Sequence, residues 1–191
     1  DPTTSHVDID DIERMEVIKG PFALRYGPAF GGVVNLVTLQ PVPYQKFEIH
    51  GRAIAGYESN WNGNKQHVDL RGGSRHVYFL LSGNRLQYGN YDDGNGTQYF
   101  SSFEKFSYSA KVGLSPAQNH QVLISYMGAQ HRNVRFPALQ MDERSDLTNS
   151  LSAAYITKGH KGIFSGANLK ASYTMVNHLM DNVSRSNADT M

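Results

Sequence analysis

Residues 46–57 read Lys-Phe-Glu-Ile-His-Gly-Arg-Ala-Ile-Ala-Gly-Tyr, and two classes of side chain alternate along most of this stretch. One set of alternate positions is small, apolar or aromatic: Phe47, Ile49, Gly51, Ala53, Ala55 and Tyr57. The other set begins with Lys46, Glu48, His50 and Arg52. A helix would mix the two sets around its surface, whereas a β-strand separates them onto opposite faces. The stretch therefore predicts a strand with one apolar face and one polar face.

The same alternation recurs along the rest of the chain. It is clear in 105–114, 121–126, 151–155 and 169–174, and weaker in 66–72 and 76–88. Seven strands are therefore predicted from residue 44 onward, and the fold class is all-β. The predicted connections alternate between tight turns and long polar loops, a pattern typical of transmembrane β-barrels.

A soluble β-sandwich would also show this alternation. Its strands are usually about 5–6 residues long, whereas several of the predicted strands run to roughly 10–16 residues. The charged face of each strand also needs water, while the opposite face is small, apolar and aromatic. A wide barrel satisfies both faces, because its polar face lines a wet lumen and its apolar face meets lipid.

Composition excludes several other classes of protein. The formal net charge of +1 over 191 residues argues against a polybasic nucleic-acid binder, so no nucleic-acid partner is expected. The absence of cysteine excludes disulfides and thiolate metal sites within these residues. No serine–histidine–aspartate set has a nucleophile elbow, so we predict that the protein is not an enzyme.

The start of the chain is richer in proline than the rest, because five of the seven prolines precede residue 44. Three quoted segments stand out: Ile-Glu-Arg-Met-Glu-Val-Ile-Lys-Gly-Pro at 12–21, Leu-Arg-Tyr-Gly at 24–27, and Gly-Gly-Val-Val-Asn-Leu-Val-Thr at 31–38. With their spacing, they resemble the end of the plug domain of TonB-dependent outer-membrane receptors. The resemblance implies that residues 1–41 are the C-terminal part of a small α+β plug. Residues 42–191 would then be the first seven or so strands of a large plugged antiparallel transmembrane β-barrel.

Particular plug residues follow from the same segments. We expect the glycines of the plug turns to allow positive φ and close backbone approach: Gly20, Gly27, Gly31 and Gly32. They do not form a P-loop, because no Lys-Ser or Lys-Thr pair follows them. The resemblance implies that some charged plug residues pair with the inner barrel wall: Glu13, Arg14, Glu16 and Arg25.

The resemblance also implies what the whole protein does and where. Receptors of this family have barrels of about 22 strands, so we expect the chain to be a piece of a longer protein. The implied function is active import of a scarce nutrient, a metal or metal chelate such as copper or a ferric siderophore, across the bacterial outer membrane. The implied partners are TonB with its inner-membrane energising complex, and outer-membrane lipid and lipopolysaccharide. No cofactor beyond the transported copper or iron chelate is expected.

A candidate metal site lies on the last predicted strand. His178 and Met180 are two residues apart, so both side chains point to the lumen face. An imidazole with a thioether suits Cu(I), and suits Cu(II) less well. The pair resembles the His-x-Met element of copper-importing members of the family, which combine it with sulfur ligands on the plug. A lumen histidine beside a wall methionine is the plain alternative, and a ferric siderophore remains open as the ligand.

The other histidines considered show no metal-ligand spacing, and we interpret them as lumen, loop or turn residues: His50, His67, His76, His120, His131 and His160. Two other functions also remain open at this point. A passive porin or a structural barrel of a secretion or adhesion assembly would share the strand pattern, but a porin would have an open lumen and steady ion conductance. A soluble secreted β-domain would need no detergent.

Overall fold

The computed structural model describes residues 7–26, 31–159, 166–183 and 185 of the chain. Two compact units make up the chain, Asp1–Gln40 and Pro41–Met191. Among the described residues, no helix combines the length and the apolar character needed to cross a membrane.

The first unit contains a two-stranded antiparallel sheet. Strand β1 (Ile12–Lys19) pairs with β2 (Gly32–Thr38), and Val17 lies opposite Val34. A short 3₁₀ helix precedes β1, and a second one, Gly20–Tyr26, follows it. The Asp8 side chain begins the first of these helices by accepting a hydrogen bond from the backbone N–H of Asp10. The quoted segments at 12–21, 24–27 and 31–38 thus fall on a strand, a helical turn and an apolar strand.

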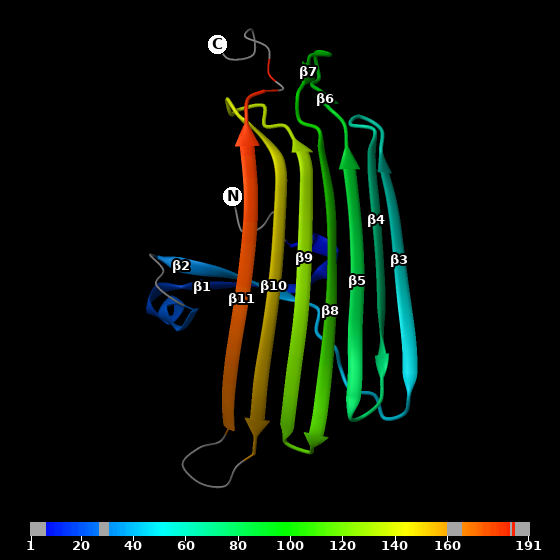
Figure 1. Cartoon of the computed structure of the whole chain (residues 1–191), viewed down its shortest axis with the longest axis vertical. Coiled ribbons are helices and arrows are strands. Elements are labelled where there is room, and N and C mark those ends of the chain that lie inside the picture. Colours follow the sequence, from blue (N-terminus) through cyan, green and yellow to red (C-terminus); the bar gives the residue numbers. More distant parts are fainter. Residues whose placement is uncertain (1–6, 27–30, 160–165, 184, 186–191) are drawn as a thin grey trace. The chain divides into compact units, whose positions relative to one another are not determined.

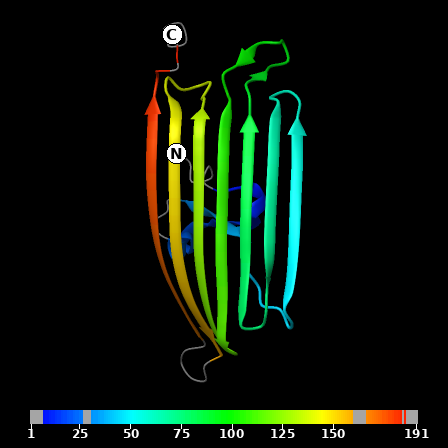
Figure 2. The same cartoon turned by 45° about the vertical axis from the view of Figure 1, so that its right-hand side comes forward.

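The second unit is built on one seven-stranded antiparallel sheet. Neighbouring strands follow one another along the chain, in the order β11-β10-β9-β8-β5-β4-β3 (Figures 1 and 2). Their bounds are Glu48–Glu58 for β3, Gly63–Gly73 for β4, Val77–Tyr88 for β5, Phe103–Ala117 for β8, His120–Val134 for β9, Asp142–Lys158 for β10 and Gly166–Asp181 for β11. The seven predicted strands are confirmed.

The loops differ from the prediction in two places. The long connection after β5 contains a small hairpin, β6 (Tyr91–Asp92) with β7 (Gln98–Tyr99). The connection before β10 is not a long loop, because β9 and β10 continue through polar residues and leave only 135–141 between them. Cross-strand hydrogen bonds extend these strands through polar residues, which local sequence patterns do not predict.

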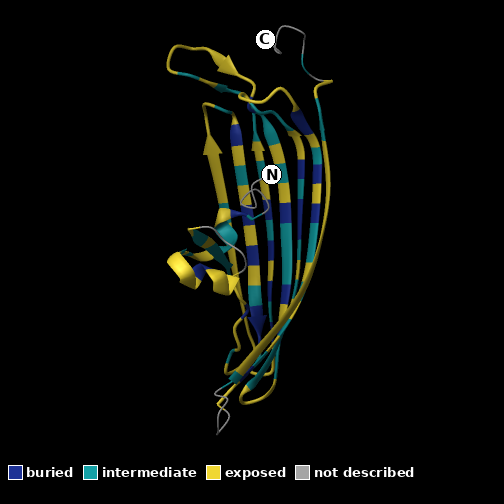
Figure 3. Ribbon diagram, turned by 90° about the vertical axis from the view of Figure 1, so that its left-hand side faces the viewer, coloured by how far each residue is buried: buried dark blue, intermediate teal, exposed yellow. Residues whose placement is uncertain are grey.

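Burial in this sheet is the reverse of that in a soluble protein. Large apolar side chains on one face of the strands are exposed: Phe106, Val112, Ile124, Tyr126, Leu151 and Tyr155. Polar and charged side chains on the other face are buried: His67, Asp69, Asn84, Ser107, Lys111 and Asp146. The two classes alternate along the inner strands (Figure 3). A soluble sandwich would bury its apolar face instead, so the arrangement favours an apolar face that meets lipid.

The exposed apolar face gives a direct stability test. Leu151 lies near the middle of β10 and is 52% exposed, while its neighbour Ser152 faces the other side of the sheet. We expect Leu151→Arg to lower the free energy of unfolding of the complete protein in lipid vesicles by roughly 2–4 kcal/mol, because arginine is costly on a lipid face near the bilayer midplane. Urea titration measures the loss. The control Ser152→Arg faces a polar interior and should cost much less. An equal cost for both variants would contradict a lipid-facing surface.

Candidate functional site

The predicted metal residues lie where three strands end beside the 135–141 loop. His178 on β11 is opposite Asp146 on β10, and Asp146 is opposite His131 on β9. Directly opposed residues of neighbouring strands share one face of a sheet. The three side chains therefore meet on the polar, buried face.

The distances within this group are short. His178 Nδ1 lies 3.1 Å from Asp146 Oδ2 and 3.9 Å from Glu143 Oε2. His131 Nδ1 lies 3.4 Å from Glu143 Oε1. Thr148 donates its hydroxyl to Oδ1 of Asp146 at 3.0 Å, which fixes the orientation of that carboxylate. Two carboxylates and two imidazoles therefore form one cluster across β9, β10 and β11.

Glu143 belongs to this cluster only because β10 is irregular. By strict alternation, Glu143 and Asp146 would face opposite sides of the sheet. The register between β10 and β11 shifts between Glu143 and Ser145, so that Arg144 has no opposite residue. Such a bulge reverses the facing of the residues beyond it. Glu143 then lies opposite Met180, on the same face as His178.

Three other histidines have carboxylate neighbours that the sequence analysis did not identify, and the exposed one is His50, whose Nε2 lies 3.0 Å from Oε2 of Glu48. His131 reaches Glu143 from the adjacent strand, and His67 Nε2 lies 3.0 Å from Oδ2 of Asp69, two residues along its own strand. His131 and His67 are both buried, which agrees with a lumen position, one of the three alternatives predicted for them. Cross-strand pairs need the register, which sequence spacing does not give, whereas the His67–Asp69 spacing was available and was missed. His160 lies outside the described residues.

His67 and Asp69 form a separate network near the other edge of the sheet. Arg52 Nε approaches Oδ2 of Asp69 at 2.5 Å, and the Asn84 side chain is hydrogen-bonded to His67 Nδ1. Asp69 also faces Arg71, whose Nε is 3.5 Å from Oδ1. Two arginines thus compensate this buried carboxylate, and the network has the character of a structural anchor.

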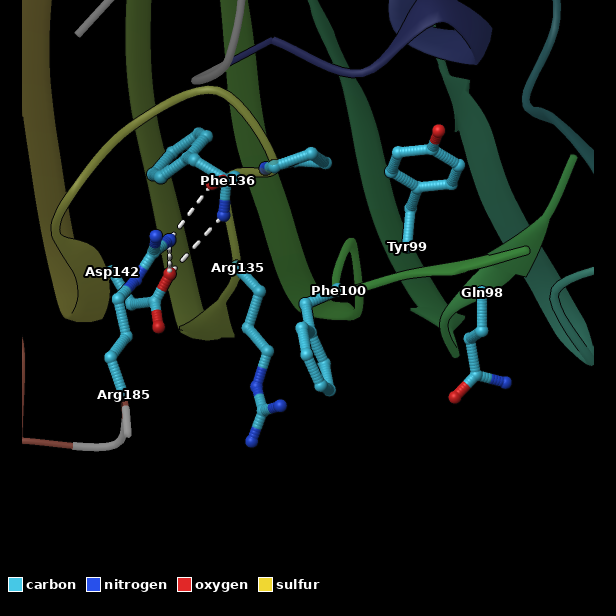
Figure 4. Close-up of a pocket in the computed structure, with 8 residues that line it drawn as sticks. Gln98, Tyr99, Phe100, Arg135, Phe136, Asp142 and Arg185 are labelled. Carbon is cyan, nitrogen blue, oxygen red and sulfur yellow. Dashed lines mark hydrogen bonds and ion pairs between the residues drawn. The ribbon is translucent and has the colours of Figure 1, made fainter. Parts of the chain in front are cut away.

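A small pocket lies between the 135–141 loop and the β6–β7 hairpin. It has a volume of about 200 Å³, and its lining includes Tyr99, Phe100, Arg135, Asp142 and Arg185 (Figure 4). Arg185 is held in place by Asp142 at 2.5 Å and by the carbonyl of Phe136. The Arg135 guanidinium lies over the Phe100 ring, 5.3 Å from its centroid. The pocket therefore presents an arginine and aromatic rings.

The charged residues of the first unit that were predicted to contact the barrel wall pair largely with one another. Arg14 Nε lies 2.9 Å from Oε1 of Glu16, and Asn35 Nδ2 donates to Oε2 of Glu16 at 2.9 Å. These hydrogen bonds, first that from Asn35 and then that from Arg14, lower the pKa of the Glu16 carboxyl. Glu13 lies 3.8 Å from Arg14, and Arg25 is exposed. Pairing of these residues with the barrel wall stays a prediction.

The plug glycines have two different structural roles. Gly20 and Gly31 have positive φ angles of 70° and 83°, a region that favours glycine. A Cβ on Gly32 would lie 2.9 Å from the carbonyl oxygen of Ile18, so glycine permits close approach of the two strands there. Gly27 lies outside the described residues.

Comparisons with known proteins find partial matches to ferric siderophore receptors. No family model matches the chain. A ferric aerobactin receptor of Klebsiella pneumoniae is 34% identical over 97 residues, which is 47% of this chain and 12% of that receptor. A ferric enterobactin receptor of Pseudomonas aeruginosa is 58% identical over 38 residues, which is 19% of this chain and 5% of that receptor.

Solved structures give the same result for the fold. The copper transporter OprC superposes with a TM-score of 0.90 at 23% identity, over 96% of this chain and 28% of that one. Part of the chain is thus similar in sequence to TonB-dependent siderophore receptors, and its fold matches part of the barrel of such receptors. A mutant of the ferric enterobactin receptor PfeA of Pseudomonas aeruginosa, solved in complex with enterobactin, matches the present chain with a TM-score of 0.66 at 18% identity. The match covers 90% of this chain and 28% of the PfeA chain.

The similarity bears on two expectations from the sequence, the class and the location of the protein. TonB-dependent receptors are integral outer-membrane transporters and not enzymes, which agrees with both expectations from the sequence. The chain spans about 12% of the length of the ferric aerobactin receptors that it matches.

Glu16 gives a pH-dependent prediction for the first unit. Because the folded state holds the pKa of Glu16 below its ordinary value of 4.5, the carboxylate stabilises the sheet above that pH and loses this effect as the pH falls through the folded pKa. We expect Asn35→Ala to reduce hydrogen-exchange protection of β1 and β2 in the complete receptor at pH 7, and to reduce it less at an acidic pH well below 4.5. Mass spectrometry, corrected for intrinsic exchange, measures both. Equal losses at the two pH values would contradict the role of Glu16.

Proposed function

We propose that the receptor imports a metal ion or a metal chelate across the bacterial outer membrane, with energy transmitted by TonB from the inner-membrane complex. The names of the similar proteins support a metal-containing ligand, because they are receptors for ferric aerobactin and ferric enterobactin and a transporter of copper. The inverted polarity of the sheet supports passage through a polar interior, since the buried face carries the charged and hydroxyl side chains.

The first unit supports energised transport over passive flow. Its quoted segments resemble the end of a plug, and Asp1–Gln40 is a compact unit of its own. A plug in a wide barrel blocks free diffusion, so the ligand passes only when TonB rearranges it. A passive porin would need no such unit.

Copper is the first candidate ligand. The observation that carries it is the placement of His178 and Met180 at alternate positions of β11, on the polar face and next to the loop end of the sheet. The His178 side chain is 28% exposed, so a ligand has access to it. Imidazole and thioether donors favour copper over the hard cations. The fold likeness to OprC is consistent with this choice.

The copper proposal is tested by removing both donors. We expect the complete receptor with His178→Ala and Met180→Ala to bind copper about 100-fold more weakly, because it lacks both proposed barrel donors. Titration of the purified receptor in detergent measures the affinity. Met175→Ala is the matched control, because Met175 lies on the same strand but on the opposite, exposed face. Unchanged copper affinity in the double variant would exclude this site and leave a chelate as the ligand.

A ferric chelate is the second candidate, supported by the pocket beside the 135–141 loop. Arg135 and the rings of Phe100 and Tyr99 suit a ligand that has negative charge and planar groups. The volume of about 200 Å³ is smaller than the roughly 300–1,000 Å³ of a typical ligand site. The pocket would therefore hold one arm of a chelate.

Arg135 decides this second candidate. We expect Arg135→Gln to weaken binding of ferric aerobactin or ferric enterobactin about tenfold, because the pocket loses its charged stacking group. Quenching of intrinsic fluorescence in the complete receptor measures binding. Arg132→Gln is the control, because Arg132 is an exposed arginine near the same end of β9 and does not line the pocket. Equal effects of the two variants would reduce the role of Arg135 to general charge attraction.

A further inference from the structure

A polar pocket lies at the loop end of the sheet, where β4 begins, β5 ends and β8 begins. Its volume is about 350 Å³, within the range of roughly 300–1,000 Å³ that small-molecule sites occupy. We call it the rim pocket, and its polar lining includes Asn62, Asn64, Gln87, Glu104 and Asn133. We infer that the rim pocket binds a neutral sugar ring, supplied either by the glycolipid of the outer leaflet or by a free saccharide. This inference does not depend on the proposed import of a metal.

Three of these side chains form a row across the sheet. Asn64 on β4 lies opposite Gln87 on β5, and Gln87 lies opposite Glu104 on β8. Directly opposed residues of neighbouring strands share one face of a sheet. Glu104 is two residues from Phe106, so the row lies on the same face as the exposed apolar side chains. The row therefore ends the apolar surface with exposed polar groups.

The position of this row matches the head-group level of a bilayer. On β8 the apolar face runs from Phe106 to Leu114, with Ala110 at its centre. From Ala110 to Glu104 the strand advances about 20 Å, at roughly 3.4 Å per residue. With a strand tilt of about 40°, this is about 15 Å along the bilayer normal, just beyond half of an apolar band about 25 Å tall. The row thus lies where the hydrocarbon ends and the sugars of a glycolipid begin.

Hydrogen bonds already order the polar row. Gln87 Nε2 donates to Oε1 of Glu104 at 3.2 Å, and Arg85 Nη2 donates to Oε1 of Gln87 at 3.2 Å. Asn64 Nδ2 donates to the carbonyl oxygen of Asn62 at 3.4 Å. An amide group has two N–H donors and an oxygen that can accept twice, so these bonds leave further capacity. Because hydroxyl groups both donate and accept, amides and a carboxylate are matched partners for a sugar.

Two aromatic rings supply the apolar part of the lining. Tyr88 and Phe103 line the rim pocket, and their rings stack with centroids 4.9 Å apart. The Tyr88 hydroxyl donates to Oε1 of Glu58 at 3.1 Å, which holds the far end of the ring. A Cβ on Gly63 would overlap the Tyr88 ring, so glycine makes room for it. A sugar ring can pack its C–H groups against such an apolar surface while its hydroxyls reach the polar row.

The charge of the rim pocket distinguishes it from the pocket beside the 135–141 loop. Among the described residues, its lining contains one carboxylate, Glu104, and no lysine or arginine. The loop pocket contains Arg135 and Arg185 instead. An anionic ligand in the rim pocket would be repelled by Glu104 without a cation in the lining to offset it. A neutral ligand that is rich in hydroxyl groups therefore fits the rim pocket best.

The test uses the complete receptor in detergent with three probes: lipopolysaccharide, a dephosphorylated oligosaccharide released from it, and lipid A. We expect the double variant Asn64→Ala, Gln87→Ala to bind the sugar-bearing probe about tenfold more weakly, because it lacks two hydrogen-bonding side chains. Calorimetry measures the oligosaccharide, and native mass spectrometry measures the two lipids. Gln66→Ala is the matched control, because Gln66 is exposed on the same face of β4 and does not line the pocket. Copper affinity should stay unchanged in both variants.

Two supporting results identify the source of the sugar. If the wild-type receptor binds lipopolysaccharide but not the free oligosaccharide, and the double variant binds lipopolysaccharide more weakly, the glycolipid is the ligand. If the wild-type receptor binds the free oligosaccharide saturably, and the double variant binds it more weakly, a free saccharide is sufficient.

The inference is overturned if the wild-type receptor binds neither sugar-bearing probe, or if the double variant binds both with wild-type affinity. Equal weakening by Gln66→Ala, or binding of lipid A as tight as that of lipopolysaccharide, would also overturn it. A thermal unfolding midpoint within a few degrees of wild type shows that a variant has folded. Glu104→Gln, which keeps the shape of the side chain, is the second variant, and we expect it to lower affinity about threefold.

Discussion

The structure depends on the need to hydrogen-bond every backbone group that lies in lipid. Hydrocarbon offers no partner to an N–H or C=O group, so a chain crosses it only with its backbone bonds made internally. The second unit meets this need along β3 to β11 with unbroken neighbour-to-neighbour antiparallel pairing. Because side chains alternate across such strands, one face meets lipid and the other encloses polar groups. The exposed Leu151 and the buried Asp146, on one strand, are the direct result.

Local periodicity predicted this wall well and its loop end poorly. The alternation of Leu151, Ala153 and Tyr155 with polar or small residues is a property of the strand itself, so it is readable in the sequence. The extension of β10 back to Asp142 depends on hydrogen bonds to β9 and β11. The bulge at Arg144, which turns Glu143 inward, depends on the register between two strands. The sequence therefore predicted His178 and Met180 as a pair but not the carboxylates beside them.

Two buried polar groups described in this sheet differ in how open they are to a ligand. Asp69 is surrounded by His67 and Arg71 from its own strand, β4, and by Arg52 from the neighbouring β3. That group has donors for its carboxylate and holds β3 and β4 in register. The group around His178 joins β9, β10 and β11 through His131, Glu143 and Asp146. Its His178 side chain is 28% exposed and is open to a ligand, whereas the His67 side chain is fully buried.

The start of β10 connects both candidate ligand sites. Asp142 fixes Arg185 at the loop pocket, and the next residue, Glu143, belongs to the cluster with His178. Adjacent residues of one strand move together, so a ligand that displaced Arg185 from Asp142 would also disturb the carboxylate beside the metal donors. Ligands at the loop pocket and at the inner cluster would therefore be coupled through one peptide unit. A chelate arm held at the loop and a metal held on the inner face would act on the same short segment of the barrel wall.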